Sequence, residues 1–307
     1  MTGTVSCPVR SLLCCFETVP DRTRGLVRGL WRFRESLSHS VSRLTLLIRL
    51  VSFLLPGLRN FTPYSTPQPK STDTTRQLTV TDTNGDVNLW GWSQSDILIN
   101  GTITARGFGA NPDAITFIES NSSGDIIFQA VFPASGPFLS PSYTVDIDVY
   151  VPSSPNLPTV MASTLNGNLQ ARSVNASSDE AFSVTNGKLS VSGVNTTDLT
   201  LTNTDGDIDL SCTCYSVVAN TTNGAITANL PSLSYTGTYA LTSTNGNVDL
   251  KVPAAGSYKI TASTTNGSVS STRLPVQLAN HVATTIGAGT ATVTATSTNG
   301  SIAVTGI

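Results

Sequence analysis

The stretch LTSTNGNVDL, residues 241–250, contains the pattern that decides the fold of this chain. An Asn-Gly step follows a threonine, and apolar residues then alternate with polar ones. The pattern recurs with small changes, and its turn residue is found at Asn84, Asn100, Asn166, Asn186, Asp205, Asn223, Asn245, Asn266 and Asn299. Alternation of this kind between turn residues predicts short β-strands from Gln77 onward.

The spacing of these turn residues indicates how the strands are arranged. Between Asn166 and Asn266 the steps are 20, 19, 18, 22 and 21 residues, and a period near this length is typical of stacked coils. Asn-Gly is also the strongest short-range signal for a tight hairpin, so an antiparallel β-sandwich of Asn-Gly hairpins is the alternative. Thr precedes the turn residue in most copies, which favours coils, because a hairpin requires nothing of that position whereas stacked coils place equal positions side by side. The 33-residue step from Asn266 to Asn299 fits a loop that leaves one coil.

We therefore predict an all-β fold, a parallel β-helix or β-solenoid with coils of about 20 residues. The turn residues should stack as a structural ladder in which Thr hydroxyls and Asn amides satisfy each other. The predicted ladder comprises Asn84, Asn166, Asn186, Asp205, Asn223, Asn245, Asn266 and Asn299. The apolar residues after the turns should line the core, namely Val87 and Leu89, Leu189 and Val191, Ile208 and Leu210, Val248 and Leu250, and Ile302 and Val304.

Residues 143–174, YTVDIDVYVPSSPNLPTVMASTLNGNLQARSV, lead into FSVTNGKLSVSGV and LTLTNTDGDIDL. A Val-Pro step before a series of Thr-Asn-Gly repeats appears again in LKVPAAGSYKITASTTNGSV, residues 250–269. This arrangement resembles the adhesin-domain family of repeated β domains. The resemblance implies a right-handed parallel β-helix at a cell surface, usually without known chemistry. The segment 107–142 is longer and more aromatic than the repeats around it, and we expect an inserted loop or a distorted coil there.

Charge divides the chain into a basic head and an acidic body. Residues 1–70 hold ten Lys/Arg and three Asp/Glu, and residues 73–307 hold seven and sixteen. The acidic body argues against nucleic acid as a partner. Residues 1–60 combine an amphipathic basic stretch with an apolar run from Val41 to Leu58 that arginines interrupt, which indicates a signal-anchor, an interfacial helix or an N-terminus extended by a wrong start site. A Pro/Ser/Thr-rich linker at 61–76 and the repeated body at 77–307 would follow.

The sequence offers no clear catalytic or metal site. Cys212 and Cys214 lie two residues apart and predict inward-facing thiols or a local redox pair, and the body has a single histidine, His281. Asp207 and Asp209 alternate with core residues, so they should be solvated turn acids rather than a glycosidase pair. We therefore expect no catalytic residues, no metal, no cofactor and no enzymatic activity.

Two features point to binding. Trp90 and Trp92 flank Gly91 and should lie on one face, where they could stack on sugar rings or, if buried, plug the first coil as a cap. The chain stops inside a repeat, so its C-terminal coil is expected to expose a strand edge and to permit self-association.

The function that these features predict is a non-catalytic, cell-surface, adhesin-like β-solenoid that mediates adhesion or interaction. Its body would lie outside the cell, anchored to the membrane by the N-terminal segment or secreted, and would contact an extracellular or cell-surface ligand. An envelope regulatory or sensor protein is the first alternative, and a polysaccharide-active β-helix enzyme is the second.

Overall fold

The computed structural model describes residues 57–66, 77–94, 96–122, 125–134, 140–153 and 157–307, which belong to one compact unit. Nearly all of the predicted membrane-proximal segment, 1–60, lies outside these ranges. None of the helices within the described residues has the length and apolar character needed to cross a bilayer.

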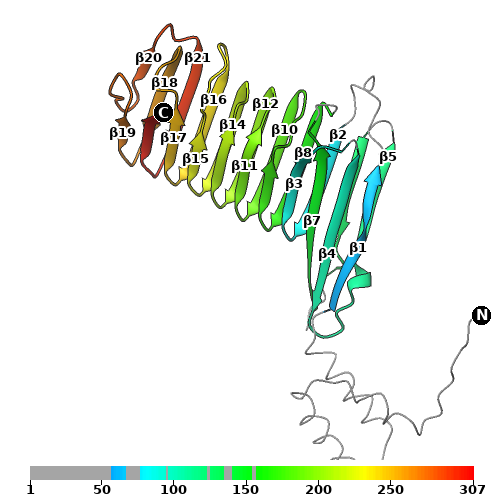
Figure 1. The fold of residues 1–307 in the computed structure, drawn as a ribbon. Coiled ribbons are helices and arrows are strands. Elements are labelled where there is room, and N and C mark those ends of the chain that lie inside the picture. Colours follow the sequence, from blue (N-terminus) through cyan, green and yellow to red (C-terminus); the bar gives the residue numbers. More distant parts are fainter. Residues whose placement is uncertain (1–56, 67–76, 95, 123–124, 135–139, 154–156) are drawn as a thin grey trace, which may run out of the picture. The chain divides into compact units, whose positions relative to one another are not determined.

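Eight stacked coils form the body, and each coil contributes one strand to each of two sheets (Figure 1). In stacking order, sheet B contains β2 (Gln77–Asn84), β8 (Thr159–Asn166), β10 (Asp179–Asn186), β12 (Asp198–Asp205), β14 (Ser216–Asn223), β16 (Thr238–Asn245), β21 (Ala291–Ser297) and β18 (Tyr258–Thr264). Sheet A contains β3 (Val87–Trp92), β9 (Leu169–Arg172), β11 (Leu189–Val194), β13 (Ile208–Cys212), β15 (Ile226–Asn229), β17 (Val248–Val252), β22 (Ile302–Gly306) and β19 (Val269–Thr272).

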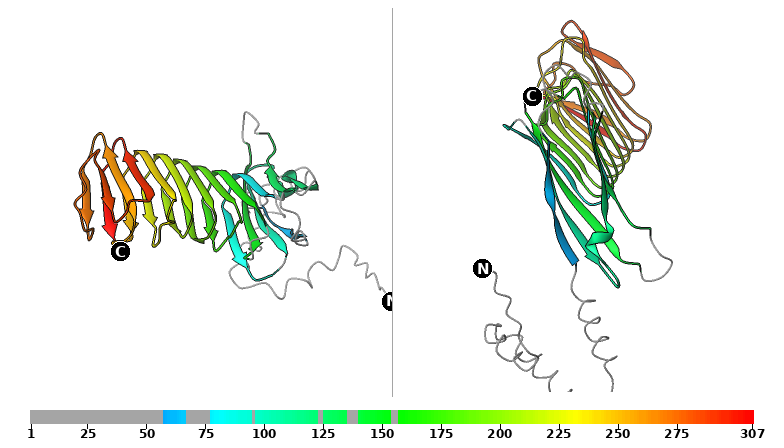
Figure 2. Two further views of the ribbon diagram at one scale, coloured as in Figure 1. Left: turned by 90° about the horizontal axis from the view of Figure 1, so that it is seen from above. Right: turned by 90° about the vertical axis from the view of Figure 1, so that its right-hand side faces the viewer.

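Neighbouring coils pair in parallel, which confirms the predicted solenoid. For example, β12 pairs in parallel with both β10 and β14. The strands of consecutive repeats therefore do not form hairpins with one another, and the alternative sandwich of Asn-Gly hairpins is wrong. Figure 2 shows the coils as a regular row of strands in two layers. All ten aliphatic residues that the sequence assigns to the core are buried.

Each repeat turns from sheet B to sheet A at its Asn-Gly or Asp-Gly step, as predicted. The glycine is required by close stacking. A Cβ on Gly187 would lie 2.0 Å from the carbonyl oxygen of Gly167 in the neighbouring coil, and a Cβ on Gly206 would lie 1.9 Å from that of Gly187. Both glycines also have positive φ angles, 145° and 151°. Glycine at this corner therefore permits neighbouring backbones to approach.

The side chains of the turn residues form the predicted ladder on the exposed corner. Amide Nδ2 donates to Oδ1 of the adjacent coil from Asn186 to Asn166 (2.8 Å), Asn223 to Asp205 (2.5 Å), Asn245 to Asn223 (2.8 Å), Asn299 to Asn245 (2.7 Å) and Asn266 to Asn299 (2.7 Å). Asn84 begins the series by donating to the carbonyl of Tyr143. The amides thus bond to one another, and not to Thr hydroxyls as the sequence suggested.

Buried polar side chains form a second row, two positions before the turn residue of each coil. Register places Asp82, Thr164, Val184, Asn203, Thr221, Ser243, Ser297 and Thr264 side by side. Six of them donate to a glycine carbonyl of the adjacent coil: Thr164 to Gly85, Asn203 to Gly187, Thr221 to Gly206, Ser243 to Gly224, Ser297 to Gly246 and Thr264 to Gly300, at 2.7–3.0 Å. We call these eight aligned positions the inner polar row, although Val184 among them is apolar.

Both sheets continue beyond the coil of β2 and β3. Strand β6 (Asp125–Val131) pairs in parallel with β2, and β7 (Ser142–Pro152) pairs in parallel with β3. Outside them run β5 (Thr116–Ser122), β4 (Ile97–Arg106) and β1 (Gly57–Thr66), all antiparallel to their neighbours. The segment 107–142 contains β5, β6 and the short 3-10 helix η3 (Pro112–Ala114).

The N-terminal linker differs from its prediction in one part. Residues 61–66, which the sequence assigns to the linker, belong to β1 and pair with β4. Pro63 falls within the register shift between Phe61 and Tyr64, and a proline is tolerated at such an irregularity because it has no N–H to donate. Strand β1 pairs with β4 through main-chain groups, which do not depend on the type of side chain, so composition alone did not reveal the strand.

The C-terminal coil does not form the end of the stack, so the predicted exposed edge there is wrong. Strand β21 lies between β16 and β18, and β22 lies between β17 and β19. The outer coil is covered on its sheet B side by β20 (Ala283–Ile286), which pairs antiparallel with β18. Asn280 also pairs its side-chain amide with the N–H and C=O of Thr264, at 2.8 and 2.9 Å. The residues between Asn266 and Asn299 therefore close the outer coil.

Candidate functional site

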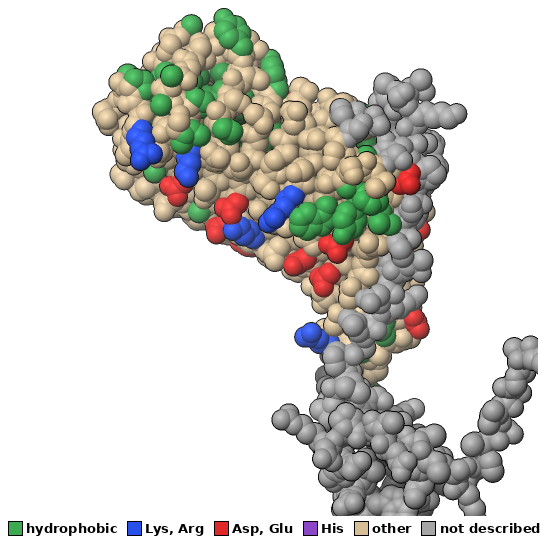
Figure 3. Space-filling view, in the orientation of Figure 1, with side chains coloured by type: hydrophobic (Ala, Val, Ile, Leu, Met, Phe, Trp, Pro, Cys, Tyr) green, Lys and Arg blue, Asp and Glu red, His purple; other side chains and the backbone are tan. Residues whose placement is uncertain are grey.

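The most distinctive outer surface lies on sheet A, where three aromatic side chains and an arginine come together. We call Trp90, Trp92, Tyr150 and Arg172 the aromatic face. Trp90 and Trp92 belong to β3, Tyr150 to β7 and Arg172 to β9, and these three strands are adjacent. Figure 3 shows hydrophobic side chains gathered on the surface over β3 and β7, with charged side chains beside them.

Strand register explains why these side chains meet. Trp90 is paired with Tyr150 on one side and with Arg172 on the other, so all three project outward from the same level of the sheet. Val87 and Leu89 of the same strand point inward and are completely buried. Gly91 separates the two indoles, and a Cβ there would lie 1.7 Å from the carbonyl oxygen of Ser173. A glycine is therefore needed between them.

Each indole is held by its neighbours. The Trp92 ring lies 5.4 Å from the Tyr150 ring, measured between centroids, with the planes tilted by 42°. Trp92 Nε1 donates to the carbonyl oxygen of Asp96 at 2.8 Å. The Arg172 guanidinium carbon lies 5.5 Å from the centroid of the Trp90 ring, which is a cation–π geometry.

Polar groups lie at the margin of the aromatic face. Asp148 Oδ1 accepts a hydrogen bond from Asn88 Nδ2 at 3.0 Å and a longer one from Trp90 Nε1 at 3.5 Å. Asp148 lies on β7, two residues before Tyr150. A carboxylate and an amide thus stand beside the rings, and a guanidinium stands over one of them.

The two tryptophans lie on one face, as the sequence predicts, but the cap interpretation is wrong. Both indoles are half-buried on the outside of sheet A, and neither enters the core. Strands β6 and β7 cover this coil instead. Their capacity to stack on a ligand remains a prediction.

The acids considered for glycoside hydrolysis are occupied in structural contacts. Asp207 Oδ1 accepts from the N–H of Ala225 at 2.8 Å, and Asp209 forms an ion pair with Lys188. Both lie outside the core near the turn, as expected. Cys212 and Cys214 are buried as free thiols, and His281 lies in the segment that closes the outer coil. Within the described part of the chain, no three His, Cys, Asp or Glu side chains cluster as metal ligands.

Two buried carboxyl groups were missed by sequence reasoning. Asp82 is 3% exposed and Glu180 is 1% exposed, and in the described residues no partner contacts either oxygen of Asp82 or Oε2 of Glu180. The pKa of Asp82 is raised to about 7, chiefly by burial; the N–H groups of Thr83 and Asn84 oppose the rise, and the charges of Asp146 and Asp86 add a smaller part to it. The signal was available, since Asp82 stands where most other repeats have Thr, Ser or Asn.

Burial likewise raises the pKa of Glu180 to about 8. Its Oε1 accepts from the N–H of Ala176 at 2.9 Å, which opposes the shift. Both carboxyl groups are buried, and neither belongs to the aromatic face.

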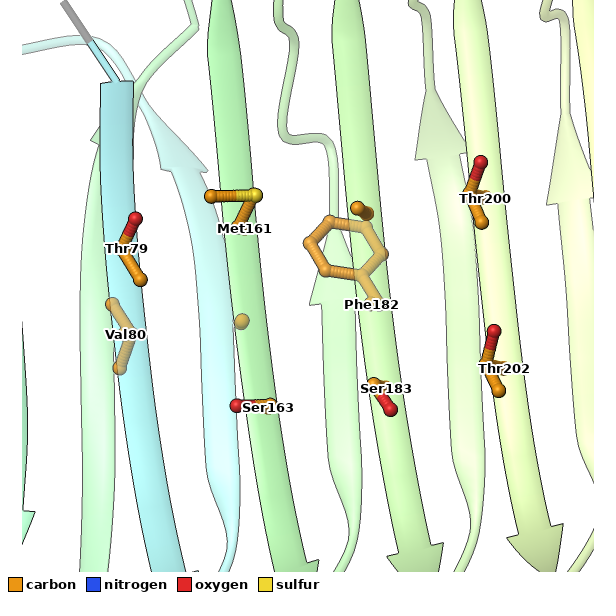
Figure 4. A pocket seen from close by; sticks show the side chains of 10 residues that line it. Thr79, Val80, Met161, Ser163, Phe182, Ser183, Thr200 and Thr202 are labelled. Atoms are coloured by element: carbon orange, nitrogen blue, oxygen red, sulfur yellow. The ribbon is translucent and has the colours of Figure 1, made fainter.

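Two hollows are lined by described residues of the solenoid. One, of about 310 Å³, lies on the outside of sheet B, where short side chains from β2, β8, β10 and β12 stand in rows (Figure 4). Its uncharged lining includes Thr79, Met161, Ser163 and Thr202. The other, of about 620 Å³, lies along the turns from sheet A to sheet B and includes Asn175, Asn195 and Tyr215. Neither combines aromatic rings with charged groups.

Comparisons with known proteins give the following matches. A family model described as Toastrack DUF4097 matches residues 69–305. No curated protein matches the chain. Among solved structures, one is named a "putative cell adhesion protein" from Clostridium sporogenes, with 9% identity, 80% of this chain and 99% of that chain covered and a TM-score of 0.41. A "putative adhesin" from Parabacteroides merdae has 10% identity, coverage of 80% and 95% and a TM-score of 0.40. A "putative lipid binding protein" from Parabacteroides distasonis has 9% identity, coverage of 82% and 96% and a TM-score of 0.35.

Proposed function

Because this chain belongs to the Toastrack DUF4097 family, we propose that it is a non-catalytic binding module of the adhesin-like kind, which holds a ligand on the outer face of its solenoid. The observation that carries the proposal is the aromatic face. Large aromatic side chains that remain half-exposed beside polar groups are characteristic of recognition surfaces.

The solenoid supports this role because its surface is rigid. The amide ladder and the inner polar row link most neighbouring coils, the first on the exposed corner and the second within the core. A surface that is already ordered loses little conformational entropy when a ligand binds. Adhesion also benefits from an elongated body, because its faces remain accessible to large partners.

We further propose that the basic N-terminal segment holds the protein at a membrane, with the solenoid outside the cell. Charge and apolar composition of residues 1–60 support this localisation. The test is to express the full chain with a C-terminal epitope and treat intact cells with protease. Loss of the epitope from intact cells is expected. Protection in intact cells combined with cleavage after lysis would contradict surface display.

Binding is tested separately from localisation. Beads coated with the full chain should adhere to cells or to extracted envelope material, and a Trp90→Ala/Trp92→Ala variant should adhere less. The control is Tyr235→Ala, which removes another exposed aromatic side chain, 72% exposed, far from the aromatic face. Equal adhesion of all three proteins would contradict this function.

The same preparations address the two alternative functions. Incubation with neutral polysaccharides should release no new reducing ends, whereas measurable turnover would favour the polysaccharide-active enzyme. A protein captured through residues 1–60 in the absence of any ligand for the solenoid would favour the envelope sensor.

A further inference from the structure

We propose that the ligand of the aromatic face is an uncharged carbohydrate, and that a sugar ring stacks on Trp90 and Trp92 while its hydroxyl groups bond to Asp148 and Arg172. This inference rests on the proposed function, because it names the ligand class of the same surface. It is argued from shape, polarity and charge of the described residues.

A sugar ring has an apolar face of C–H groups and a rim of hydroxyls, and the aromatic face has the complementary composition. The indoles of Trp90 and Trp92 supply flat apolar surface from one strand. Tyr150 adds a third ring at 5.4 Å from Trp92. Aromatic rings that combine apolar area with a polar atom are well suited to ligands that are themselves amphipathic.

The rings are positioned before any ligand arrives. Trp92 is fixed by its hydrogen bond to the Asp96 carbonyl and by the Tyr150 ring, and Trp90 is fixed by Arg172 and Asp148. Preorganised aromatic side chains lose little rotamer freedom on binding. Weak stacking contacts can therefore produce measurable affinity.

The margin of the face provides the hydrogen bonds that hydroxyls need. Both described bonds to Asp148 end at Oδ1, so Oδ2 can accept from a ligand hydroxyl. Arg172 is exposed, and its guanidinium presents several N–H donors beside the Trp90 ring. If the Gln170 amide is oriented with its oxygen toward the guanidinium, that oxygen accepts from Nε and Nη2 at 3.2 and 3.0 Å, and Nη1 is left for a ligand. A carboxylate that accepts and a guanidinium that donates together suit a group that does both, and a hydroxyl does both.

Charge favours an uncharged sugar over an acidic one. Arg172 is balanced by Asp148, and two more carboxylates lie nearby, Asp146 on the outside of β7 and Asp86 directly before β3. An anionic polysaccharide, a nucleic acid or an anionic lipid surface would meet this excess of carboxylates and be repelled. An uncharged glycan would not.

The test uses the full chain and a panel of immobilised polysaccharides. Uncharged members are β-glucan, xylan, mannan and chitin, and acidic members are polygalacturonate and heparin. Retention on at least one uncharged polysaccharide is expected, with quenching or a spectral shift of tryptophan fluorescence when the soluble oligosaccharide is added. Stronger retention on the acidic members would overturn the inference.

Variants assign the binding to residues. Trp90→Ala and Trp92→Ala should each weaken binding by about tenfold or more, since buried aromatic contacts dominate such interfaces, whereas Tyr235→Ala should leave it unchanged. Because an indole also supports its strand, Arg172→Gln provides a second variant that removes the guanidinium without removing a ring. Circular dichroism and the thermal midpoint identify variants that fail to fold. Full retention by all three aromatic-face variants would overturn the inference.

The outcome is distinguishable from failure of the proposed function. Adhesion that depends on Trp90 and Trp92 without retention on any uncharged polysaccharide would support the proposed binding function and overturn the inference that the ligand is a carbohydrate. Concentration-dependent dimerisation that Trp90→Ala abolishes would also overturn it, because the face would then contact a second copy of the chain.

Discussion

At the scale of single residues, Asp82 occupies a position where most of the equivalent side chains donate a hydrogen bond. Its equivalents in the inner polar row donate to a glycine carbonyl of the adjacent coil. For Asp82 the corresponding acceptor is the carbonyl of Val145. In the next coil, Thr164 donates to the carbonyl of Gly85, and a Cβ on Gly167 would lie 1.9 Å from that oxygen. In the coil of Asp82, a Cβ on Gly85 would lie 2.1 Å from the carbonyl oxygen of Val145, which therefore has the equivalent position. A protonated Asp82 can donate there, and an ionised one cannot.

Stability should therefore depend on pH through Asp82. The carboxyl keeps its proton in the folded state up to about pH 7, whereas an aspartate normally loses it near 3.8. Between these values the folded state binds more protons, so the free energy of unfolding should decrease as pH rises from about 4 to about 7. Asp82→Asn retains a donor, as Asn203 does in its own coil, and should remove this contribution. Urea unfolding of both proteins at several pH values measures it.

Glu180 provides the control for that experiment. Its pKa is raised to about 8, so its contribution has the same sign and is lost over a range that extends to higher pH. Asp82→Asn should retain the Glu180 part of the decrease, and the double variant with Glu180→Gln should lose both. Identical pH profiles for the wild-type chain and Asp82→Asn would show that Asp82 ionises normally.

Asp205 interrupts the amide ladder. Its Oδ1 accepts from Asn223, but a carboxylate cannot donate to Asn186 in the preceding coil. Asp205→Asn should supply that bond and raise the free energy of unfolding by about 0.5–1 kcal/mol. Asp205→Ala, which removes the acceptor for Asn223 and supplies no donor for Asn186, should lower it. Chemical denaturation ranks the three proteins, and an Asp205→Asn variant less stable than the wild type would contradict the ladder argument.

At the scale of strands, β10 has a gap in the inner polar row. Val184 aligns with Thr164 and Asn203 but has no donor for the carbonyl of Gly167. Val184→Thr should add a hydrogen bond with little change of volume and stabilise the fold by up to about 1 kcal/mol. Thr221→Val makes the reverse change and should cost about 1–3 kcal/mol, because the Gly206 carbonyl loses its partner. Urea unfolding compares the two variants with the wild type. If Val184→Thr destabilises the chain as much as Thr221→Val does, the prediction is wrong.

The sequence predicts the strands well because the information is local. Alternation of apolar and polar residues determines which side chains enter the core, and Asn-Gly determines where each strand ends, as in β8 and β10. The inner polar row was not predicted because Thr and Ser look alike in sequence whether they face water or the core. The sequence also explains the turn glycines only in part, because the close approach of Gly187 to Gly167 arises only when the coils stack.

The aromatic face was only half predictable for a similar reason. Trp90 and Trp92 are neighbours in sequence, and period-2 geometry places them together. Tyr150 and Arg172 join them from β7 and β9, which lie much further along the chain and follow no spacing that the repeats display. Tyr150 pairs with Trp90 only because β7 extends the sheet beyond the coils and lies beside β3.

At the scale of the whole molecule, stacking order departs from chain order at both ends. The coil of β2 and β3 stacks directly on the coil of β8 and β9, and the strands between them in the chain, β4 to β7, lie on its other side. The final coil lies between two coils that precede it in the chain. Each coil presents nearly the same sequence pattern to its neighbours, so the repeats alone do not specify which coils lie next to each other.

This order makes the outer coil dependent on the final one. Residues 258–286 pair with the rest of the solenoid through β21 and β22, which lie between β16 and β18 and between β17 and β19. Deleting residues 291–307 should therefore remove amide hydrogen-exchange protection from β18 and β19, while β10, β12 and β14 keep theirs. Gly300→Ala should have a weaker effect of the same kind, because its Cβ would lie 2.1 Å from the carbonyl oxygen of Gly246. Tyr235→Ala, which removes an exposed side chain outside the final and outer coils, is the control. Retained protection of β18 after the deletion would mean that the outer coil can close the gap and pair with β16 itself, and the stacking order would then not depend on the final coil.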